Sequence, residues 1–437
     1  MQIYKTKNKI TMNQLIKELK DRGLLASTSG NLEELLKSPT TFYVGTDPTA
    51  DSLHLGHLLA FTTAKLLQAY GHKPIVLLGG ATAFIGDPSF KSEERKLLSA
   101  DIVEHNIKGI HSQVSRLLDF NSNEPNGAIM VNNYDWMKDF SFIDFAREVG
   151  KCITVNYMMA KDSVKKRLER DGSGMSFTEF TYQLIQGYDF VELYKNYDCK
   201  LQIGGSDQYG NGTTGLELIR KMLGNDDACV LTWPLVTKAD GTKFGKSEKG
   251  NIWLDAEKTS PYEFYQFWLN QSDEDSERFI KMFTLIPLDE INGMIERHRE
   301  NPSKRFLQHA LAEYMTKMIH GEDALQSVKE ATDFLFGKID INDVSDNAWK
   351  TIANEVASVE VPREVFEDTN VPSIELAVLH DKVPSKSEAR KLIKNNGFSV
   401  NKIKIGEKDT FDVSNLIDDK YILLTKGKKE HCLIIAK

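Results

Sequence analysis

The sequence predicts an α/β fold: a doubly wound parallel sheet in the first half of the chain, then an α-helical domain and a small α+β domain. Short apolar runs typical of buried strands alternate with longer helical patterns. These strand patterns stop after about residue 260 and return only beyond residue 371. The expected strands are 41–46, 73–80, 128–133, 200–204 and 229–235, and the expected helices between them include 92–118, 141–149 and 177–196.

The remaining elements follow from local turn and capping chemistry. Residues 12–38 indicate helical pieces around a Gly/Ser break at 28–30, and the turn DPTADS leads into a helix that begins at LGHLL. Successive helices are expected from about 261 to 336, and Ser385 with Glu388 forms a capping-box start for a later helix. We therefore expect a sheet domain at 1–240, a helical domain at 241–340, a linker at 341–370 and a small domain at 371–437.

Composition places the chain among ordinary globular proteins. It has 437 residues, of which 41% are hydrophobic and 27% charged, so disordered and collagen-like classes are excluded. Four cysteines occur without any CxxC pair, which argues against a disulfide scaffold or a structural metal and fits a reducing cytoplasm. No stretch approaches the roughly 18 apolar residues of a membrane span. We expect a cytoplasmic protein with no membrane partner.

Charge is unevenly distributed along the chain. The net charge is −8, yet residues 371–437 carry 13 basic against 9 acidic side chains. A basic tail on an acidic body allows an anionic partner at the C-terminal end. The alternative is a small excess of solvated lysines, which charge alone does not exclude.

The first candidate site is the strand–turn–helix segment at 43–58. Tyr43 and Gly45 fall near the carboxyl end of the first strand, where open α/β sheets bind ligands. His54, Gly56 and His57 start the next helix, whose amino terminus favours anions such as phosphate. Two satisfied surface histidines are the alternative, and a metal pair is another, although no third ligand lies nearby in the sequence.

The second candidate site is the segment KADGTKFGKSEKG at 238–250. Its glycines surround Lys243, Lys246 and Ser247, a composition that suits a mobile clamp on polyphosphate. The segment is not a Walker loop, because GxxxxGK[ST] is absent. Taken alone it is more often a solvated lysine loop.

Together the two motifs, HLGH at 54–57 and KFGKS at 243–247, resemble the two signatures of class I aminoacyl-tRNA synthetases. Longer segments narrow the resemblance to bacterial-type tyrosyl-tRNA synthetases. These segments are YVGTDPTADSLHLGHL, GGATAFIGDPSFKSEER, FTEFTYQLIQGYDF, QIGGSDQYGN and TKADGTKFGKSE. The resemblance implies a Rossmann-like catalytic domain with a dimer-forming insertion. It also implies a ligase that makes tyrosyl-adenylate from L-tyrosine and ATP and transfers tyrosine to the 3′-terminal ribose of tRNA(Tyr).

The resemblance implies a set of residues that hold tyrosine. They are Tyr43, Asp87, Tyr182, Gln186, Asp189 and Gln208. The spacing of Tyr182, Gln186 and Asp189 (i, i+4, i+7) independently predicts one helix face for all three. A parallel apolar stripe, from Phe177 to Val191, is expected on another face. The alternative is that the polar face is simply solvated.

The resemblance also implies residues for ATP and for catalysis. The ATP-binding set is Gly45, Asp47, His54, Gly56, His57, Gly204, Asp207, Lys243, Lys246 and Ser247. The catalytic set is Thr49, His54, His57, Lys91, Arg95, Lys243 and Lys246. No protein acid or base is needed, because the tyrosine carboxylate attacks the α-phosphorus in line and pyrophosphate leaves. The protein positions the reactants and stabilises phosphoryl charge, with Mg²⁺ on the phosphates.

The C-terminal domain resembles a small RNA-binding module of a ribosomal protein. Its helix at 386–395 is expected to direct Lys386, Arg390, Lys391 and Lys394 toward a tRNA backbone. The family further implies a homodimer.

Two alternatives and three departures remain. Tryptophan specificity is the alternative within the same fold, and a catalytically inactive RNA-binding protein is the alternative from another class. Where many relatives have Cys, this chain has Val44. Thr46 and Tyr209 also depart from the common pattern, with unknown effects on ATP or tyrosine affinity.

Overall fold

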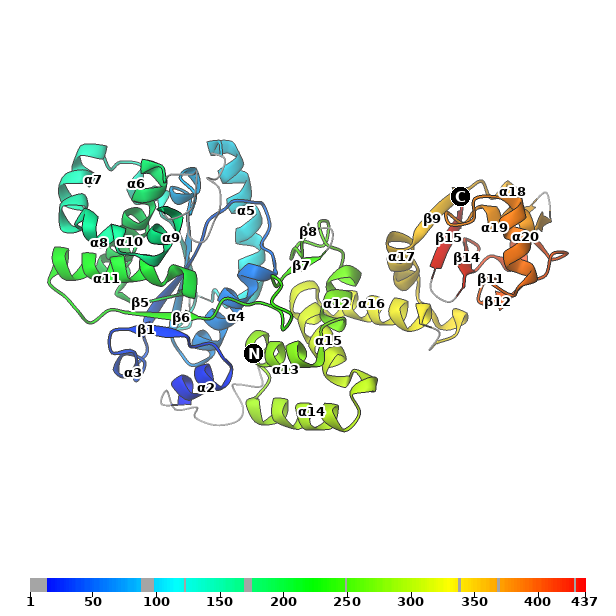
Figure 1. Cartoon of the computed structure of the whole chain (residues 1–437), viewed down its shortest axis with the longest axis horizontal. Helices are drawn as coiled ribbons and strands as arrows, with labels where there is room; N and C mark the ends of the chain where they lie inside the picture. The colour runs from blue at the N-terminus through cyan, green and yellow to red at the C-terminus, as the bar shows by residue number, and fades with distance from the viewer. Residues whose placement is uncertain are drawn as a thin grey trace. The chain divides into compact units, whose positions relative to one another are not determined.

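The computed structural model describes residues 14–87, 98–121, 123–168, 175–247, 250–336, 339–367, 370–427 and 430–437 (Figure 1). The chain divides into two compact units. The first comprises Met1–Thr259 with Phe267–Ile319, and the second comprises Ser260–Gln266 with His320–Lys437. No helix in the described ranges has both the length and the apolar character needed to cross a membrane.

The first unit is organised by a six-stranded sheet with the strand order β1-β6-β5-β2-β3-β4. Its strands are β1 (Ser27–Ser29), β2 (Thr41–Thr46), β3 (Lys73–Leu78), β4 (Ile129–Asn132), β5 (Cys199–Gly205) and β6 (Cys229–Trp233). All neighbours pair in parallel except β1, which runs antiparallel to β6. The predicted parallel, doubly wound sheet is confirmed. The Gly/Ser break at 28–30 falls on the antiparallel edge strand.

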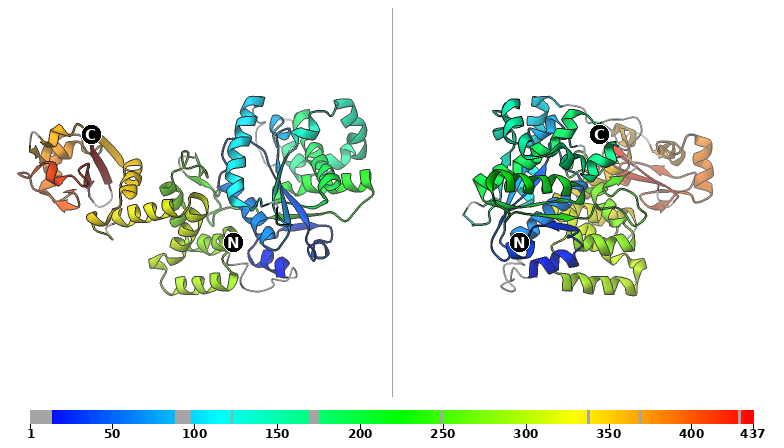
Figure 2. Two further views of the ribbon diagram at one scale, coloured as in Figure 1. Left: turned by 180° about the vertical axis from the view of Figure 1, so that it is seen from behind. Right: turned by 60° about the vertical axis from the view of Figure 1, so that its left-hand side comes forward.

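Helices cover both faces of this sheet (Figure 2). On one face α4 (Leu55–Ala69) packs against β2, β3 and β5, while α10 (Phe177–Tyr197) and α11 (Tyr209–Leu223) pack on β5 and β6. Side chains along β2 alternate between the two faces of the sheet. Tyr43 lies on the face covered by α10 and α11, because it belongs to the hydrophobic core cluster that contains residues of these helices. The strand order reverses between β2 and β5, so the carboxyl ends of these strands form the expected ligand crevice.

Further helices complete the first unit. They are α2 (Leu15–Asp21), α3 (Leu32–Leu35), α5 (Ala100–Leu117), α6 (Tyr134–Met137), α7 (Phe142–Glu148), α8 (Val155–Met159), α9 (Asp162–Leu168), α13 (Asp273–Phe283), α14 (Leu288–Glu300) and α15 (Phe306–His320). The buried guanidinium of Arg22 joins α2 to α13 by donating to the carbonyls of Lys281, Thr284 and Ile286 at 2.7–2.9 Å. These are carbonyls at and beyond the end of α13, so Arg22 acts as a C-terminal cap supplied by a distant helix.

Two local expectations differ from the structure. The helix expected at 92–118 begins at Ala100, and residues 88–97 lie outside the described part of the chain. Phe177 was expected in an apolar core stripe, but 66% of it is exposed and its ring contacts Phe142 at 6.4 Å. It is the first residue of α10.

The second unit contains a five-stranded sheet with the order β12-β11-β14-β15-β9. Its strands are β9 (Ala357–Val361), β11 (Phe398–Val400), β12 (Ile403–Lys404), β14 (Tyr421–Lys426) and β15 (Glu430–Ala436). A smaller pair is β10 (Val371–Pro372) with β13 (Thr410–Phe411), and the helices are α16 (Glu322–Leu335), α17 (Asp346–Glu355), α18 (Glu364–Glu367), α19 (Ser373–Val378) and α20 (Lys386–Lys394). Helix α12 (Pro261–Leu269) crosses from this unit into the first.

The linker expected at 341–370 is instead folded into this unit. It contains α17 and β9, and β9 pairs in parallel with β15 from the end of the chain. Trp349 of α17 is fully buried and stacks on Tyr421 with ring centroids 5.4 Å apart. This segment carries acidic residues on its exposed surface and apolar residues on its other face. The apolar face packs against one side of the C-terminal sheet.

Candidate active site

The amino terminus of α4 holds two stacked histidines. His54 is the N-cap, and its Nδ1 accepts the Gly56 N–H at 3.0 Å, while the Nδ1 of His57 accepts the His54 N–H at 3.3 Å. Both neutral rings therefore carry their proton on Nε2, as inferred from the hydrogen bonds. The ring centroids lie 3.9 Å apart. A Cβ at Gly56 would meet the His54 ring at 2.8 Å, so glycine is required for this arrangement.

The KFGKS segment lies against this same helix terminus. Leu55 N–H donates to the Ile252 carbonyl at 3.0 Å, and Leu254 N–H donates to the Leu53 carbonyl at 2.9 Å. Gly245 adopts φ +78°, and a Cβ there would come within 3.2 Å of Leu55 Cβ. Lys246 follows in β7 (Lys246–Ser247), which pairs with β8 (Gly250–Asn251). Backbone hydrogen bonds thus join the start of α4 to residues 252–254, which follow the KFGKS motif in the chain.

A buried carboxylate lies between the sheet and α10. Asp189 is 1% exposed and accepts Asn133 Nδ2–H at 3.0 Å and Trp136 Nε1–H at 2.9 Å. Burial raises its pKa to about 7, although both hydrogen bonds act to lower it. The Tyr43 hydroxyl is also buried and has no hydrogen-bond partner within the described chain. Burial and then the charge of Asp189 raise the pKa of Tyr43 well above its ordinary value.

A chain of amides connects the other expected tyrosine contacts. Gln208 Nε2–H donates to Asp87 at 2.8 Å, and Gln186 Nε2–H donates to Gln208 at 3.1 Å. Asn211 donates to both Gln186 and Gln208, at 2.8 and 3.1 Å. The buried Tyr182 has its pKa raised by burial and then by Asp47 and Asp87, which places this tyrosine beside the same network. Hydrogen bonds therefore join three of the six residues expected to hold tyrosine, namely Asp87, Gln186 and Gln208, and Tyr182 bonds to Asp47.

Asp47 connects this network to the carboxyl end of β2. Its carboxylate accepts Tyr182 O–H at 2.9 Å and Thr82 O–H at 2.7 Å. A Cβ at Gly79 would approach the Asp47 carboxylate to 2.0 Å, so the end of β3 is shaped around this side chain. Asp47 was expected to contact ATP, and here it also fixes Tyr182.

The remaining expected residues are distributed as follows. Gly45, Gly204 and Asp207 lie at the carboxyl ends of β2 and β5, next to the strand-order reversal, and Thr49 is an exposed residue of the following turn. Lys243 and Lys246 are exposed. Lys91 and Arg95 lie outside the described residues, and the Ser247 side chain is not described. The departures Val44 and Thr46 are buried, whereas Tyr209 O–H donates to the Thr28 carbonyl at 3.4 Å.

Sequence reasoning missed four residues of the site. Asn133 and Trp136 hold Asp189, Thr82 holds Asp47, and Asn211 holds the two glutamines. The sequence does contain a signal for Asn133 and Trp136, because NNYDW (132–136) spans the carboxyl end of the expected strand at 128–133, which is the ligand-binding edge of such a sheet. Among the described residues, no cluster of three His, Cys, Asp or Glu side chains is arranged to hold a metal ion.

Comparison with known proteins identifies the family. Residues 35–337 match tRNA synthetases class I (W and Y), and residues 352–434 match the tyrosine–tRNA ligase SYY-like C-terminal domain. A tyrosine–tRNA ligase of Flavobacterium johnsoniae is 52% identical over 431 residues, covering 97% of this chain and 99% of its own length. The chain belongs to the tyrosine–tRNA ligase family. A member from Bacteroides fragilis is 51% identical over 429 residues, with 97% and 99% coverage.

Solved structures agree with this membership. A C-terminally truncated mitochondrial tyrosyl-tRNA synthetase of Aspergillus nidulans aligns with a TM-score of 0.66 and 32% identity, covering 77% of this ligase and 96% of that chain. A Plasmodium falciparum tryptophanyl-tRNA synthetase is 15% identical with a TM-score of 0.52, covering 76% and 92%, and shares the fold alone. The predicted resemblance is confirmed, and the enzyme is a tyrosine–tRNA ligase of the class I fold.

Asp189 gives this ligase a testable pH dependence. Its pKa of about 7 lies above the ordinary value of 3.8, so the folded state binds the proton more tightly than the unfolded state. The stability that this proton contributes is fully present below about pH 4 and is lost as pH rises through about 7. Relative to Asp189→Asn, the wild type should lose free energy of unfolding across this window, by at most about 1.4 kcal/mol per pH unit. Urea denaturation from pH 5 to 8 measures the difference, and parallel profiles for the two proteins would contradict the assignment.

Proposed function

We propose that the chain activates L-tyrosine with ATP to tyrosyl-adenylate, releasing pyrophosphate, and then transfers tyrosine to the 3′-terminal ribose of tRNA(Tyr). Three features at the carboxyl edge of the parallel sheet support this proposal. These are the start of α4 bonded to the segment that follows the KFGKS motif, the buried pair of Tyr43 and Asp189, and the amide network around Gln186. The reaction takes place in the cytoplasm in this proposal.

Tyr43 and Asp189 recognise the phenol of the substrate. The substrate hydroxyl donates to Asp189 and accepts from the Tyr43 hydroxyl, which otherwise lacks a partner in the described chain. Phenylalanine leaves the Tyr43 hydroxyl unpaired and gives Asp189 no bond beyond those from Asn133 and Trp136, and an unpaired buried polar group costs about 1–3 kcal/mol. Enzymes of this class are themselves the established example of such rejection, at about 10⁵-fold. Tyr182, Asp87 and Gln186 hold the ammonium at the other end, with Gln208 supporting Asp87.

The phosphates of ATP lie between the two signature motifs. The Nε2–H groups of His54 and His57 donate to phosphate oxygens at the start of α4, where the helix dipole also favours negative charge. Lys243 and Lys246 bind the same phosphates, and the family resemblance assigns Ser247, Thr49, Lys91 and Arg95 to this role as well. Gly45, Asp47, Gly56, Gly204 and Asp207 hold the adenosine. Mg²⁺ enters with ATP as part of the substrate, bound to phosphate oxygens.

Chemistry in this site requires position and charge rather than a proton-transfer group. The tyrosine carboxylate attacks the α-phosphorus, the bond to the pyrophosphate oxygen breaks, and negative charge grows on the phosphoryl oxygens. Fixed N–H donors and ammonium groups stabilise that charge without reorganising. In the second step a terminal ribose hydroxyl of tRNA attacks the acyl carbon and AMP leaves.

The C-terminal α20 contacts the tRNA backbone in this proposal. Ala389 and Ile393 are buried, whereas Lys386, Arg390, Lys391 and Lys394 are exposed. Lys386 differs from the others because its ammonium pairs with Glu375 at 2.8 Å. The three remaining cations are therefore better placed to neutralise phosphates.

A second copy of the chain covers an apolar surface of the first unit. Phe142, Ile143, Val155, Leu168 and Phe177 are 69%, 75%, 63%, 43% and 66% exposed. They lie on α7, α8, α9 and the first turn of α10, and Phe142 contacts Phe177. Large apolar side chains gathered at this density mark an interaction surface. Because members of the family form homodimers, we expect a second copy of the chain to cover this surface. In this proposal the surface belongs to the dimer-forming insertion.

Pyrophosphate exchange tests the activation step. The wild type should exchange pyrophosphate into ATP with tyrosine and not with phenylalanine or tryptophan. His54→Ala, Lys243→Ala and Lys246→Ala should each slow adenylate formation about 10²–10³-fold, because each removes a donor to developing charge. Tyrosine affinity should change little, and Lys195→Ala, an exposed lysine of α10, serves as the control. A main effect on the tyrosine dissociation constant would show that these residues are not transition-state groups.

Salt dependence tests the tRNA surface. Arg390→Ala, Lys391→Ala and Lys394→Ala should weaken tRNA binding and reduce the slope of log Kd against log salt by about one for each phosphate that the removed side chain neutralised. Lys386→Ala should change the slope less, because that lysine is already paired. Exchange without tRNA should stay at the wild-type rate. An unchanged slope in all four variants would exclude α20 from the interface. Substitutions are preferable to truncation, since a chain ending near 368 would leave β9 without β15.

The oligomeric state tests the apolar surface. Ile143→Glu places a charge at the centre of the proposed interface and should shift sedimentation from dimer to monomer at micromolar concentration. Ile403→Glu substitutes an equally exposed isoleucine in the second unit, 71% exposed, and should leave the dimer intact. A wild-type chain that sediments as a monomer would remove this part of the proposal.

A further inference from the structure

Residues 237–247, here called the signature loop, contain the two lysines of the KFGKS motif. The loop begins as a tight hairpin, with Thr237 paired to Lys243 and the Gly241 N–H donating to the Lys238 carbonyl at 2.9 Å. Asp240 closes the turn by accepting from the backbone and hydroxyl of Thr242. Both lysines project from this hairpin and its continuation. Their positions therefore depend on what fixes the hairpin to the rest of the first unit.

A carboxylate and a guanidinium of α13 hold the base of the hairpin. Asp275 is 3% exposed, and its two oxygens accept the Ala239 N–H at 3.0 and 3.2 Å. Arg278 pairs with Asp275 at 2.8 Å and also donates to the Thr237 carbonyl. One helical turn of α13 thus forms hydrogen bonds with both Thr237 and Ala239 at the start of the signature loop. Neither residue belongs to the sequence motifs or to the expected site.

An aromatic contact fixes the middle of the loop to the same helix. Phe244 lies between the two lysines at 9% exposure. Its ring lies 4.8 Å from Phe279 and 5.0 Å from Phe283, both on α13. The loop is therefore attached to α13 at its entry by hydrogen bonds and at Phe244 by ring packing.

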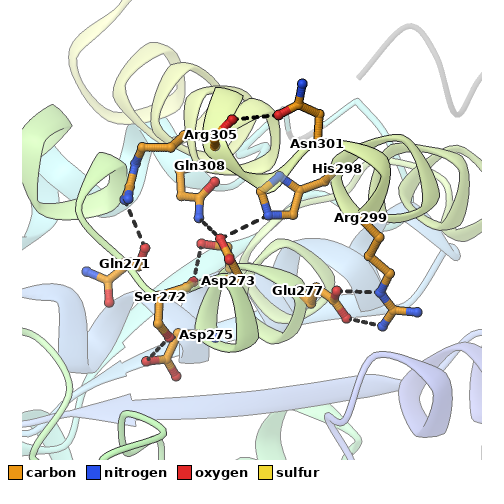
Figure 3. A network of polar contacts seen from close by, with 12 residues as sticks. Gln271, Ser272, Asp273, Asp275, Glu277, His298, Arg299, Asn301, Arg305 and Gln308 are labelled. Atoms are coloured by element: carbon orange, nitrogen blue, oxygen red, sulfur yellow. Dashed lines mark hydrogen bonds and ion pairs between the residues drawn. The ribbon is translucent and has the colours of Figure 1, made fainter.

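The amino terminus of α13 is itself held by the neighbouring helices (Figure 3). Ser272 caps the helix by accepting the Asp275 N–H at 3.1 Å and donates its hydroxyl to the same carboxylate. Asp273, two residues before Asp275, accepts His298 Nε2–H at 3.0 Å and Gln308 Nε2–H at 2.6 Å. The two carboxylates differ in what they hold, since Asp273 bonds to α14 and α15 and Asp275 bonds to the loop.

We propose that Asp275 and Arg278 are positioning residues for adenylate formation, which hold the signature loop so that Lys243 and Lys246 meet the phosphates of ATP. The inference rests on the proposed function and adds to it two residues that do not touch substrate. Misplacement of a catalytic group by about 1 Å costs on the order of 100-fold in rate, so a loosened base is expected to slow chemistry strongly. Tyrosine binding, on the other side of the sheet edge, should be unaffected.

Single-turnover adenylate formation with the full chain tests this role. Asp275→Ala should lower the rate constant about 10- to 100-fold with an unchanged tyrosine dissociation constant. Asp275→Asn, which still accepts the Ala239 N–H, should recover part of the loss, and Arg278→Ala should slow the reaction in the same way. Asp273→Ala is the matched control: it removes two hydrogen bonds from the same helix turn without touching the loop, so it should reduce thermal stability with little effect on the rate.

A mutant cycle distinguishes positioning from general loss of structure. If Asp275 acts through Lys243 and Lys246, adding Asp275→Ala to a variant that already carries Lys243→Ala and Lys246→Ala should not slow the reaction further. Additive losses, or equal losses in Asp273→Ala and Asp275→Asn, would overturn the proposal. Should Asp275→Ala fail to fold, Asp275→Asn and Arg278→Ala decide the question. A wild-type chain without tyrosine-dependent exchange would refute the proposed function itself, which is a separate result.

Discussion

The active site depends on one short backbone connection, between residues 53–55 at the start of α4 and residues 252–254 after the KFGKS motif. Leu55 donates to Ile252 and Leu254 donates to Leu53. Backbone bonds fix main-chain positions irrespective of side-chain rotamers, so the histidines and the lysines are held in one frame. Gly245 and Gly56 are needed at this contact because a Cβ at either would crowd its neighbours. The two histidines and the segment that follows the KFGKS motif are therefore held together by this connection.

In the proposed tyrosine pocket, buried polar groups lack some of their hydrogen bonds until the substrate phenol binds. A carboxylate at 1% exposure is unfavourable in its charged form, and the raised pKa of Asp189 expresses that cost. Asn133 and Trp136 offset part of it, and the Tyr43 hydroxyl remains without a partner in the described chain. A phenol completes these hydrogen bonds, whereas an unsubstituted ring does not. In the proposed function, selectivity for tyrosine follows from the burial of these groups.

The sequence was informative where a residue's role depends on local pattern. The five parallel strands have apolar runs bounded by turns, and the spacing of Tyr182, Gln186 and Asp189 already implied one helix face, on which Tyr182 and Asp189 prove to be buried. It failed where role depends on a distant partner. The strand β9 has mostly exposed side chains, and only its pairing with β15, at the far end of the chain, makes it a strand. Asn133 and Trp136 likewise gain meaning only from Asp189, a residue on another element. The assignment of side chains to tyrosine, ATP and tRNA stays a prediction.

Helix α13 is separated from the signature loop by β8 and α12, yet it holds the base of that loop. Its first turn carries Asp273, Glu274 and Asp275, and the positive end of the helix dipole stabilises such negative charge. The buried Asp275 is satisfied at the same time by Arg278 and the Ala239 N–H, which complete its hydrogen bonds. An apolar residue there would pack but would leave the Ala239 N–H to solvent and the loop entry unheld. A buried carboxylate is thus the side chain that meets the needs of the helix and of the loop together.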